Sequence, residues 1–276
     1  MEQLASASLS RNCAPFHERF RGYAEISVHE LGVIRLEQTD GEQSAGEELQ
    51  STVWDAGVTL SNAIAACWLP DFWHGKRVVE CGSGCGLCGI VAAKLGAHCI
   101  LTDLPPIVPL LARNARANDV TVDVCALDWE MSVVPAALVG ADVILGSDIT
   151  CFTQDLPLLA RLLQRMAHSH TMILLAHHDR GDVDCLHEAL RDGFTCERMH
   201  LPWDADGCAS PIHVYRVQRR QHHGFDSIDA IDDDHAQDCC DARGSTEPSR
   251  DAVLAALRGD VSALKRQLCS LEGHVS

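Results

Sequence analysis

Short apolar runs alternate with amphipathic stretches along the middle of the chain. The apolar runs predict buried strands at 77–81, 99–102, 122–125, 141–145, 171–176, 196–200 and 212–217. Apolar residues at helical spacing between these runs predict helices at 86–95, 107–118, 156–167 and 182–191. This alternation indicates an α/β fold with a doubly wound, mostly parallel seven-stranded sheet and helices on both faces. In such a fold a ligand binds at the carboxyl ends of the strands.

The flanking segments have other patterns. Alternating Val, Ile and Leu at 25–36 predict a strand hairpin, and helical spacing from Trp54 to Leu69 predicts a helix stopped by Pro70. Residues 221–247 carry eight acidic residues against one basic residue, which is typical of a flexible linker. We therefore divide the chain into a strand-rich N-terminal extension (1–50), a ligand-binding domain (51–220), an acidic linker (221–248) and a short helical tail (249–276).

The charge balance narrows the range of partners. The chain holds 22 Lys and Arg against 39 Asp and Glu, a net charge of −17. An acidic protein is a poor binder of nucleic acid, whose phosphates require a basic face, but it attracts a basic protein segment. Apolar runs stay well below the ~20 residues that span a bilayer, so we expect no membrane partner.

The 14 cysteines fit a reducing compartment better than a disulfide framework, since the chain is neither short nor visibly secreted. Residues 1–14 lack the basic and apolar blocks of a secretory signal. We expect the cytoplasm, with the nucleus also open. Cys81, Cys85 and Cys88 lack a second ligand pair for zinc, so we predict free thiols and no metal.

The segment 78–90 carries the strongest chemical signal. A strand ends in Glu80, the loop supplies Gly82, Gly84 and Gly86, and a helix follows. Glycines permit tight turns and a close approach of ligand to the main chain. Asp103 ends the next strand, where a carboxylate would accept hydrogen bonds from the ribose hydroxyls of an adenosine-bearing cofactor.

The identity of that cofactor follows from charge and spacing. The acidic strand end would repel a pyrophosphate but suits a cationic sulfonium, and the glycine spacing differs from that of dinucleotide binders. This favours S-adenosylmethionine, with an NAD-dependent enzyme as the alternative.

Further motifs along residues 54–219 share one order and spacing with a known family. They are Val53-Trp-Asp55, Glu80–Gly86, Thr102-Asp-Leu-Pro105, Asn114-Ala-Arg-Ala-Asn118, Leu127-Asp-Trp129 and Gly146-Ser-Asp148. This part of the chain resembles methyltransferase family 16, the class I, seven-β-strand, Rossmann-like S-adenosylmethionine-dependent protein-lysine methyltransferases. The resemblance implies methyl transfer to a non-histone protein that presents an accessible lysine.

The resemblance also implies the roles of individual residues. Asp148 is the expected catalytic residue, which faces the substrate. A buried acid without a partner is costly, and this cost adds Glu80 to the cofactor-binding set. The other expected cofactor-binding residues are Trp54, Gly82, Ser83, Gly84, Asp103, Trp129 and Ser147.

One position departs from the family pattern. The aromatic residue of the family's D-x-x-Y motif is replaced by Cys151, and Phe152 follows it. A cysteine cannot stack on an ammonium. Two alternatives therefore stay open: a methyltransferase with another acceptor, or a catalytically weakened S-adenosylmethionine-binding interaction protein.

Three further polar features have structural interpretations. Asp148 could instead cap a helix that begins within a few residues. His177 and His178, after the fifth strand, are interpreted as exposed loop histidines, and Asn114 and Asn118 as capping or packing residues.

Overall fold

The computed structural model describes residues 22–38, 51–204 and 210–220. The chain divides into two units, Met1–Arg220 and Gln221–Ser276, and all described residues belong to the first. The predicted linker and helical tail therefore lie outside the described residues. Within the described ranges, no helix has both the length and the apolar character that crossing a membrane requires.

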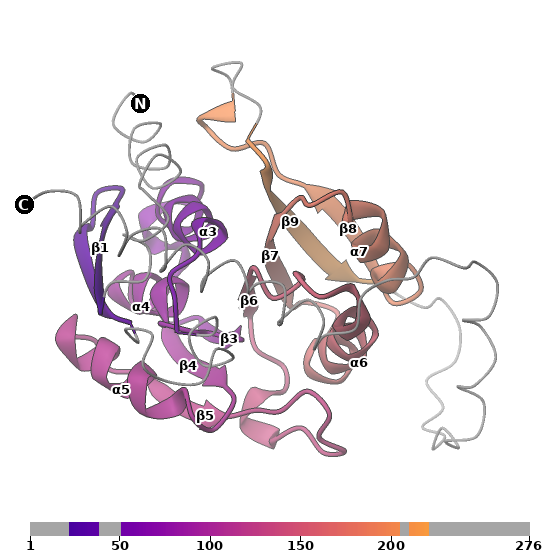
Figure 1. Cartoon of the computed structure of the whole chain (residues 1–276), viewed down its shortest axis with the longest axis horizontal. Helices are drawn as coiled ribbons and strands as arrows, with labels where there is room; N and C mark the ends of the chain where they lie inside the picture. Colours follow the sequence, from indigo (N-terminus) through magenta and orange to yellow (C-terminus); the bar gives the residue numbers. More distant parts are fainter. Residues whose placement is uncertain (1–21, 39–50, 205–209, 221–276) are drawn as a thin grey trace, which may run out of the picture. The chain divides into compact units, whose positions relative to one another are not determined.

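A seven-stranded sheet forms the centre of the first unit, as predicted (Figure 1). Its strands lie in the order β5-β4-β3-β6-β7-β9-β8, and all neighbours pair in parallel except those of β9. Each predicted strand is present, with ends within two residues of the expected ones. The strands are β3 (Arg77–Cys81), β4 (His98–Asp103), β5 (Asp123–Ala126), β6 (Val143–Ser147), β7 (Met172–His178), β8 (Phe194–Arg198) and β9 (Ile212–Arg219).

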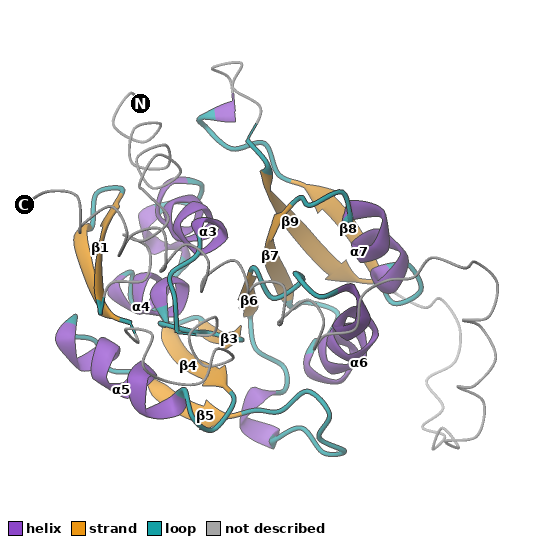
Figure 2. Cartoon of the chain, viewed as in Figure 1, coloured by secondary structure: helices purple, strands orange, loops and turns teal. Residues whose placement is uncertain are grey.

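Helices cover both faces of this sheet (Figure 2). Alternate strand residues point to opposite faces, so Val78 and Leu174 join one hydrophobic cluster and Val79 and Leu175 the other. The first cluster contains residues of α3 (Asp55–Ala66), α4 (Leu87–Lys94) and α5 (Val108–Ala117), and the second those of α6 (Leu156–Met166) and α7 (Val183–Leu190). The doubly wound arrangement is thus confirmed.

The first of these helices is shorter than predicted. It ends at Ala66, not Leu69, and Pro70 opens a short 3-10 helix, η2 (Pro70–Phe72). The indole nitrogen of the fully buried Trp73 donates a hydrogen bond to the carbonyl of Ile64 in the last turn of α3. This bond satisfies one of the carbonyls that a helix end leaves without a partner, and the chain turns back onto the helix there.

The strand hairpin near the N-terminus packs on the first helical layer. It consists of β1 (Tyr23–Val28) and β2 (Gly32–Glu37), paired antiparallel, and its alternate apolar residues join the first cluster. Asn114 on α5 accepts a hydrogen bond from the amide of Glu37 and donates one to its carbonyl. Asn118 likewise accepts a hydrogen bond from the amide of Arg35 and donates one to its carbonyl. The two asparagines thus pair with the open edge of β2 as a neighbouring strand would. Both predicted interpretations are represented: the two asparagines attach the hairpin, and Asn118 also caps the end of α5, where its side chain donates to the carbonyl of Asn114 at 2.8 Å.

Candidate active site

The glycine loop joins β3 to α4 at the carboxyl edge of the sheet. Gly82, Gly84 and Gly86 all have left-handed backbone angles, with φ of 59°, 54° and 83°. A Cβ added at Gly82 would lie 2.6 Å from Cγ2 of Ile149 and 3.6 Å from Cζ2 of Trp129. Both the backbone angle and the close neighbours therefore require glycine at position 82.

Asp103, at the end of β4, lies directly against this loop. Its Oδ2 accepts the amide of Gly84 at 2.8 Å, and its Oδ1 accepts the amide of Leu104 at 2.7 Å. The residue is 7% exposed, and burial raises the pKa of its carboxyl above the ordinary value, while the two amide bonds oppose that rise. Each carboxylate oxygen has two acceptor positions, so the two amides leave room for further donors.

Ser83 uses its side chain within the protein. Its hydroxyl donates to the carbonyl of Glu80 at 3.2 Å and accepts the amide of Thr102 at 3.0 Å. The Thr102 hydroxyl donates to the same carbonyl at 2.7 Å. Together with the main-chain bonds from the Ser83 amide to Thr102 and from the Gly86 amide to the Ser83 carbonyl, these bonds hold the ends of β3 and β4 together and fix the turn. The contact of Ser83 with the cofactor stays a prediction.

Glu80 is 1% exposed, and its carboxylate lies against the first turn of α4. Its Oε2 accepts the amide of Gly89 at 3.1 Å, an approach that a side chain at position 89 would obstruct, since a Cβ there would lie 2.8 Å away. Desolvation raises the pKa of Glu80 to about 7, with hydrogen bonds from Gly89, Ser83 and Cys88 acting in the opposite direction. In this geometry Glu80 supports the loop and its helix from within.

The remaining predicted cofactor residues lie around the loop. Trp129, after β5, is half-buried with its ring beside Gly82. Ser147, at the end of β6, lies next to Gly57 on the first turn of α3, where an added Cβ would be 3.4 Å from its hydroxyl oxygen. Half-buried Trp54 precedes that turn, and its carbonyl accepts the first amide bonds of α3.

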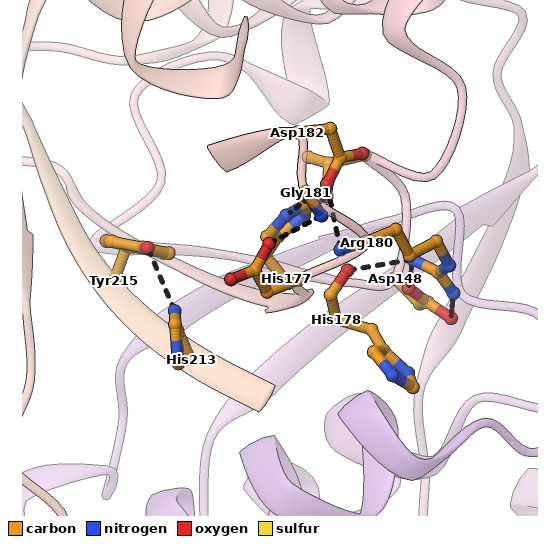
Figure 3. A network of polar contacts seen from close by, with 10 residues as sticks. Asp148, His177, His178, Arg180, Gly181, Asp182, His213 and Tyr215 are labelled. Atoms are coloured by element: carbon orange, nitrogen blue, oxygen red, sulfur yellow. Dashed lines mark hydrogen bonds and ion pairs between the residues drawn. The ribbon is translucent and has the colours of Figure 1, made fainter. Parts of the chain in front are cut away.

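Asp148 follows β6 and faces Arg180 from the loop after β7 (Figure 3). Nη1 and Nη2 of Arg180 donate to Oδ1 and Oδ2 of Asp148, both at 3.0 Å. Asp148 has a left-handed φ of 54°, which is uncommon for a residue with a side chain. The helix-cap interpretation of Asp148 is wrong, because α6 begins only at Leu156 and Asp155 is its N-terminal flanking residue.

His177 is buried, with 1% exposure, and the interpretation as an exposed loop histidine is wrong for it. The residue belongs to β7, whose hydrogen bonding continues two residues past the predicted end of the strand. Its Nδ1 lies 2.7 Å from the Thr150 hydroxyl and its Nε2 lies 3.0 Å from Oδ1 of Asp182. The imidazole thus links the loops that follow β6 and β7. His178, the next residue, is half-exposed.

His177, Asp179 and Asp182 also form a group whose ligand atoms lie within 4.8 Å of one another. Such groups can hold a metal ion when their ligand atoms are available. Both ring nitrogens of His177 are already in hydrogen bonds within the protein. We therefore interpret this group as a structural bridge.

Comparison with known proteins identifies the family. A family model described as lysine methyltransferase matches residues 35–189. The chain is 31% identical over 225 residues to EEF1A lysine methyltransferase 3 of Xenopus tropicalis, an alignment that covers 73% of this chain and 96% of that protein. It is 34% identical over 178 residues to protein N-lysine methyltransferase METTL21A of Danio rerio, with coverage of 62% and 78%.

The chain belongs to the lysine methyltransferase family. It is an S-adenosylmethionine-dependent protein-lysine methyltransferase, as the sequence motifs predicted. Among solved structures, the 16S rRNA methyltransferase RsmC of T. thermophilus, in complex with AdoMet and guanosine, matches with a TM-score of 0.51 and 16% identity. That match covers 72% of this chain and 51% of the other, and it supports the fold.

The residues of this methyltransferase fit its cofactor. The left-handed glycines let a ligand approach the main chain of the loop closely, and the buried Asp103, which already accepts the amides of Gly84 and Leu104, retains acceptor positions beside it. This combination is what the ribose of an adenosine requires. Asp103 and the loop of Gly82, Ser83 and Gly84 would hold S-adenosylmethionine, with Trp54, Trp129 and Ser147 as the predicted outer contacts.

The acceptor side of the methyltransferase has an unusual loop. Cys151 is half-buried, and desolvation, followed by the charge of Asp148, raises its pKa to about 12. The thiol is therefore neutral near pH 7 and offers no charge to an incoming amine. Phe152, the next residue, is also half-buried.

Arg180 and Thr150 were missed by sequence reasoning. Arg180 lies in the loop after β7, at the carboxyl edge where ligands bind, and left-handed Gly181 next to it marks a turn. The position of Arg180 at this edge could have marked it as a candidate site residue. No sequence signal marks Thr150, because its partner His177 lies 27 residues away in the sequence.

Proposed function

We propose that this methyltransferase methylates a lysine in a basic segment of a non-histone protein, with EEF1A as the first candidate. Two observations support the proposal: the net charge of −17, and a relative named for EEF1A that aligns over 96% of its length. The last of these carries the choice of EEF1A.

Different residues of the chain bind the cofactor and the acceptor lysine. S-adenosylmethionine, when bound, supplies an electrophilic methyl carbon on a cationic sulfur. Asp103 and the glycine loop bind and orient this cofactor from the ends of β3 and β4. Asp148 follows β6, which lies beside β3 in the sheet, and its neighbour Ile149 lies next to Gly82 of the glycine loop. Asp148 receives the lysine side chain. Catalysis then rests on holding the amine in line with the methyl group.

The acidic surface supports a basic acceptor. Electrostatic attraction raises the rate at which a basic segment meets an acidic protein, and salt weakens that effect. We also propose that the protein works in the cytoplasm, because reduced thiols such as buried Cys81 and Cys99 suit a reducing compartment.

The test is transfer of radiolabelled methyl groups from S-adenosylmethionine to purified EEF1A, with the modified residue identified by mass spectrometry. We expect label on lysine with the wild-type protein, and at least about tenfold less label with Asp103→Ala at a subsaturating concentration of S-adenosylmethionine. Label on another protein in a cell lysate, with none on EEF1A, would reject EEF1A while retaining the lysine methyltransferase activity.

A further inference from the structure

The carboxylate of Asp148 is fixed from two sides. Its head group is held by both terminal nitrogens of Arg180, and its backbone amide donates to the carbonyl of Ala176 on β7 at 2.9 Å. The Asp148 side chain is only 6% exposed, while that of Arg180 is 38% exposed. Arg180 thus lies on the solvent side of a nearly buried carboxylate, and the pair has no net charge.

Arg180 is itself held in place by the loop that contains it. Its Nη1 also donates to the carbonyl of His178 at 3.0 Å, and its amide donates to Oδ1 of Asp182 at 3.1 Å. The same oxygen of Asp182 contacts His177, which contacts Thr150 two residues after Asp148. Figure 3 shows Arg180 between Asp148, His178 and Asp182, with His177 beside Asp182. It holds the guanidinium where it faces the carboxylate.

Charged and titratable groups from several elements surround the pair. They are Asp55 at the start of α3, Cys151 and Asp155 after β6, His177 and His178 on β7, and Asp182 before α7. Burial lowers the pKa of His178, and the positive charge of Arg180 lowers it further, while Asp148 and Asp55 act in the opposite direction. Arg180 therefore already disfavours a second cation beside it.

We propose that Arg180 is a positioning residue that neutralises Asp148, so that the target lysine binds beside this carboxylate and yet loses its proton to water before methyl transfer. This inference rests on the proposed role of Asp148 as the acceptor-side residue. A lone carboxylate would bind the lysine ammonium tightly and keep it protonated, and a protonated amine has no electron pair with which to attack. The pair Asp148–Arg180 keeps the hydrogen-bond acceptor and removes the net negative charge.

The test compares Arg180→Gln with Arg180→Lys, which keeps the charge. The rate of a single turnover is measured from pH 6.5 to 10 at saturating S-adenosylmethionine and EEF1A, and the KM for EEF1A is measured separately by varying its concentration. If EEF1A is not labelled, the acceptor labelled in a lysate takes its place. For Arg180→Gln we expect a lower KM for the acceptor and a pH midpoint of the rate that moves up by about one unit. At a pH below that midpoint the rate then falls about tenfold. Arg180→Lys should keep the wild-type midpoint.

Two control variants separate the outcomes. Arg191→Gln removes an exposed arginine that pairs with Glu188 on the same chain, and it should change neither midpoint nor KM. Asp148→Asn tests the proposed role of Asp148, because an unchanged acceptor KM in that variant would reject it whatever Arg180 does. An equal loss of rate at every pH in Arg180→Gln, with the midpoint unchanged, would overturn the inference about Arg180.

A second measurement needs no acceptor protein. Cys151→Lys places an ammonium at a position where the charges of Asp148 and Arg180 act on the pKa of the side chain. Its pKa is measured by carbon NMR in protein loaded with S-adenosylhomocysteine, whose binding confirms folding. We expect a pKa about one unit higher when Arg180→Gln is added. Equal pKa values in the two proteins would also overturn the inference.

Discussion

Gly84 donates its amide to Oδ2 of Asp103 at 2.8 Å, although 19 residues separate the two in the sequence. The bond ties the glycine loop after β3 to the end of β4, which lies beside it in the sheet. A single carboxylate therefore shapes the loop and remains available to the ribose hydroxyls that the loop brings near it. This double role makes Asp103 the residue on which cofactor binding most depends.

The hairpin β1–β2 should depend on Asn114 for its attachment. Asn114→Ala removes hydrogen bonds to the amide and carbonyl of Glu37 and to the carbonyl of Cys85 in the glycine loop. Because each such bond contributes about 1 kcal/mol and its partners are left partly or fully buried, we expect a loss of about 2–4 kcal/mol in the free energy of unfolding. Urea denaturation followed by circular dichroism measures it.

Arg113→Ala is the matched control on the same helix. It removes the exposed ion pair with Glu37, in which Nε lies 2.9 Å from Oε2, and should cost less than about 1 kcal/mol. Equal losses in the two variants would contradict the role given to Asn114.

Glu80 should make stability depend on pH. Its pKa is raised to about 7 from 4.5, so the folded protein holds a proton that the unfolded chain releases between these values. The free energy of unfolding should therefore fall as pH rises from about 4.5 to about 7, by roughly 3 kcal/mol, and then level off.

Glu80→Gln should abolish this dependence, since the amide oxygen can still accept the Gly89 bond but carries no charge. Relative to wild type, the variant should gain stability between pH 5 and about pH 7 in urea titrations, and the difference should level off towards pH 8. A constant difference between the two proteins over that range would show that Glu80 is ionised throughout.

An aromatic side chain in the loop after β6, which contains Cys151, should strengthen binding of the acceptor lysine. Cys151→Tyr places a ring where the family pattern has one, and a ring over an ammonium is worth about 0.5–2 kcal/mol. We expect the KM for the acceptor to fall by about two- to thirtyfold, because the ring binds the charged lysine before it loses its proton, with affinity for S-adenosylhomocysteine unchanged. Cys185→Tyr, at an exposed position of α7, is the control. No gain would mean that Phe152 or another group already stacks on the lysine.

The sheet and the glycine loop could be predicted because their signals are local. The mostly apolar segment Val78 to Cys81 predicts a buried strand, and glycines between a strand and a helix indicate a cofactor-binding loop. The end of the first long helix could not be predicted from Pro70 alone. Its last turn is determined by Trp73, which folds back to Ile64.

The acceptor side was harder to predict because its contacts join distant segments. Asp148 meets Arg180 across 32 residues, and Thr150 meets His177 across 27. The sequence gives no sign that His177 lies under a loop, since a histidine at a strand end is usually exposed. The role of Asn114 likewise depends on a hairpin 77 residues earlier.

Calorimetric titration with S-adenosylhomocysteine tests the central claim most directly, in wild type, Asp103→Ala and the control Asp123→Ala. Asp123 is exposed at the start of β5, away from the loop. The account predicts saturable one-site binding in wild type and in the control, and a loss of at least about tenfold in affinity for Asp103→Ala. Absence of binding in folded wild-type protein, or equal affinity in all three, would contradict the site described at the ends of β3 and β4.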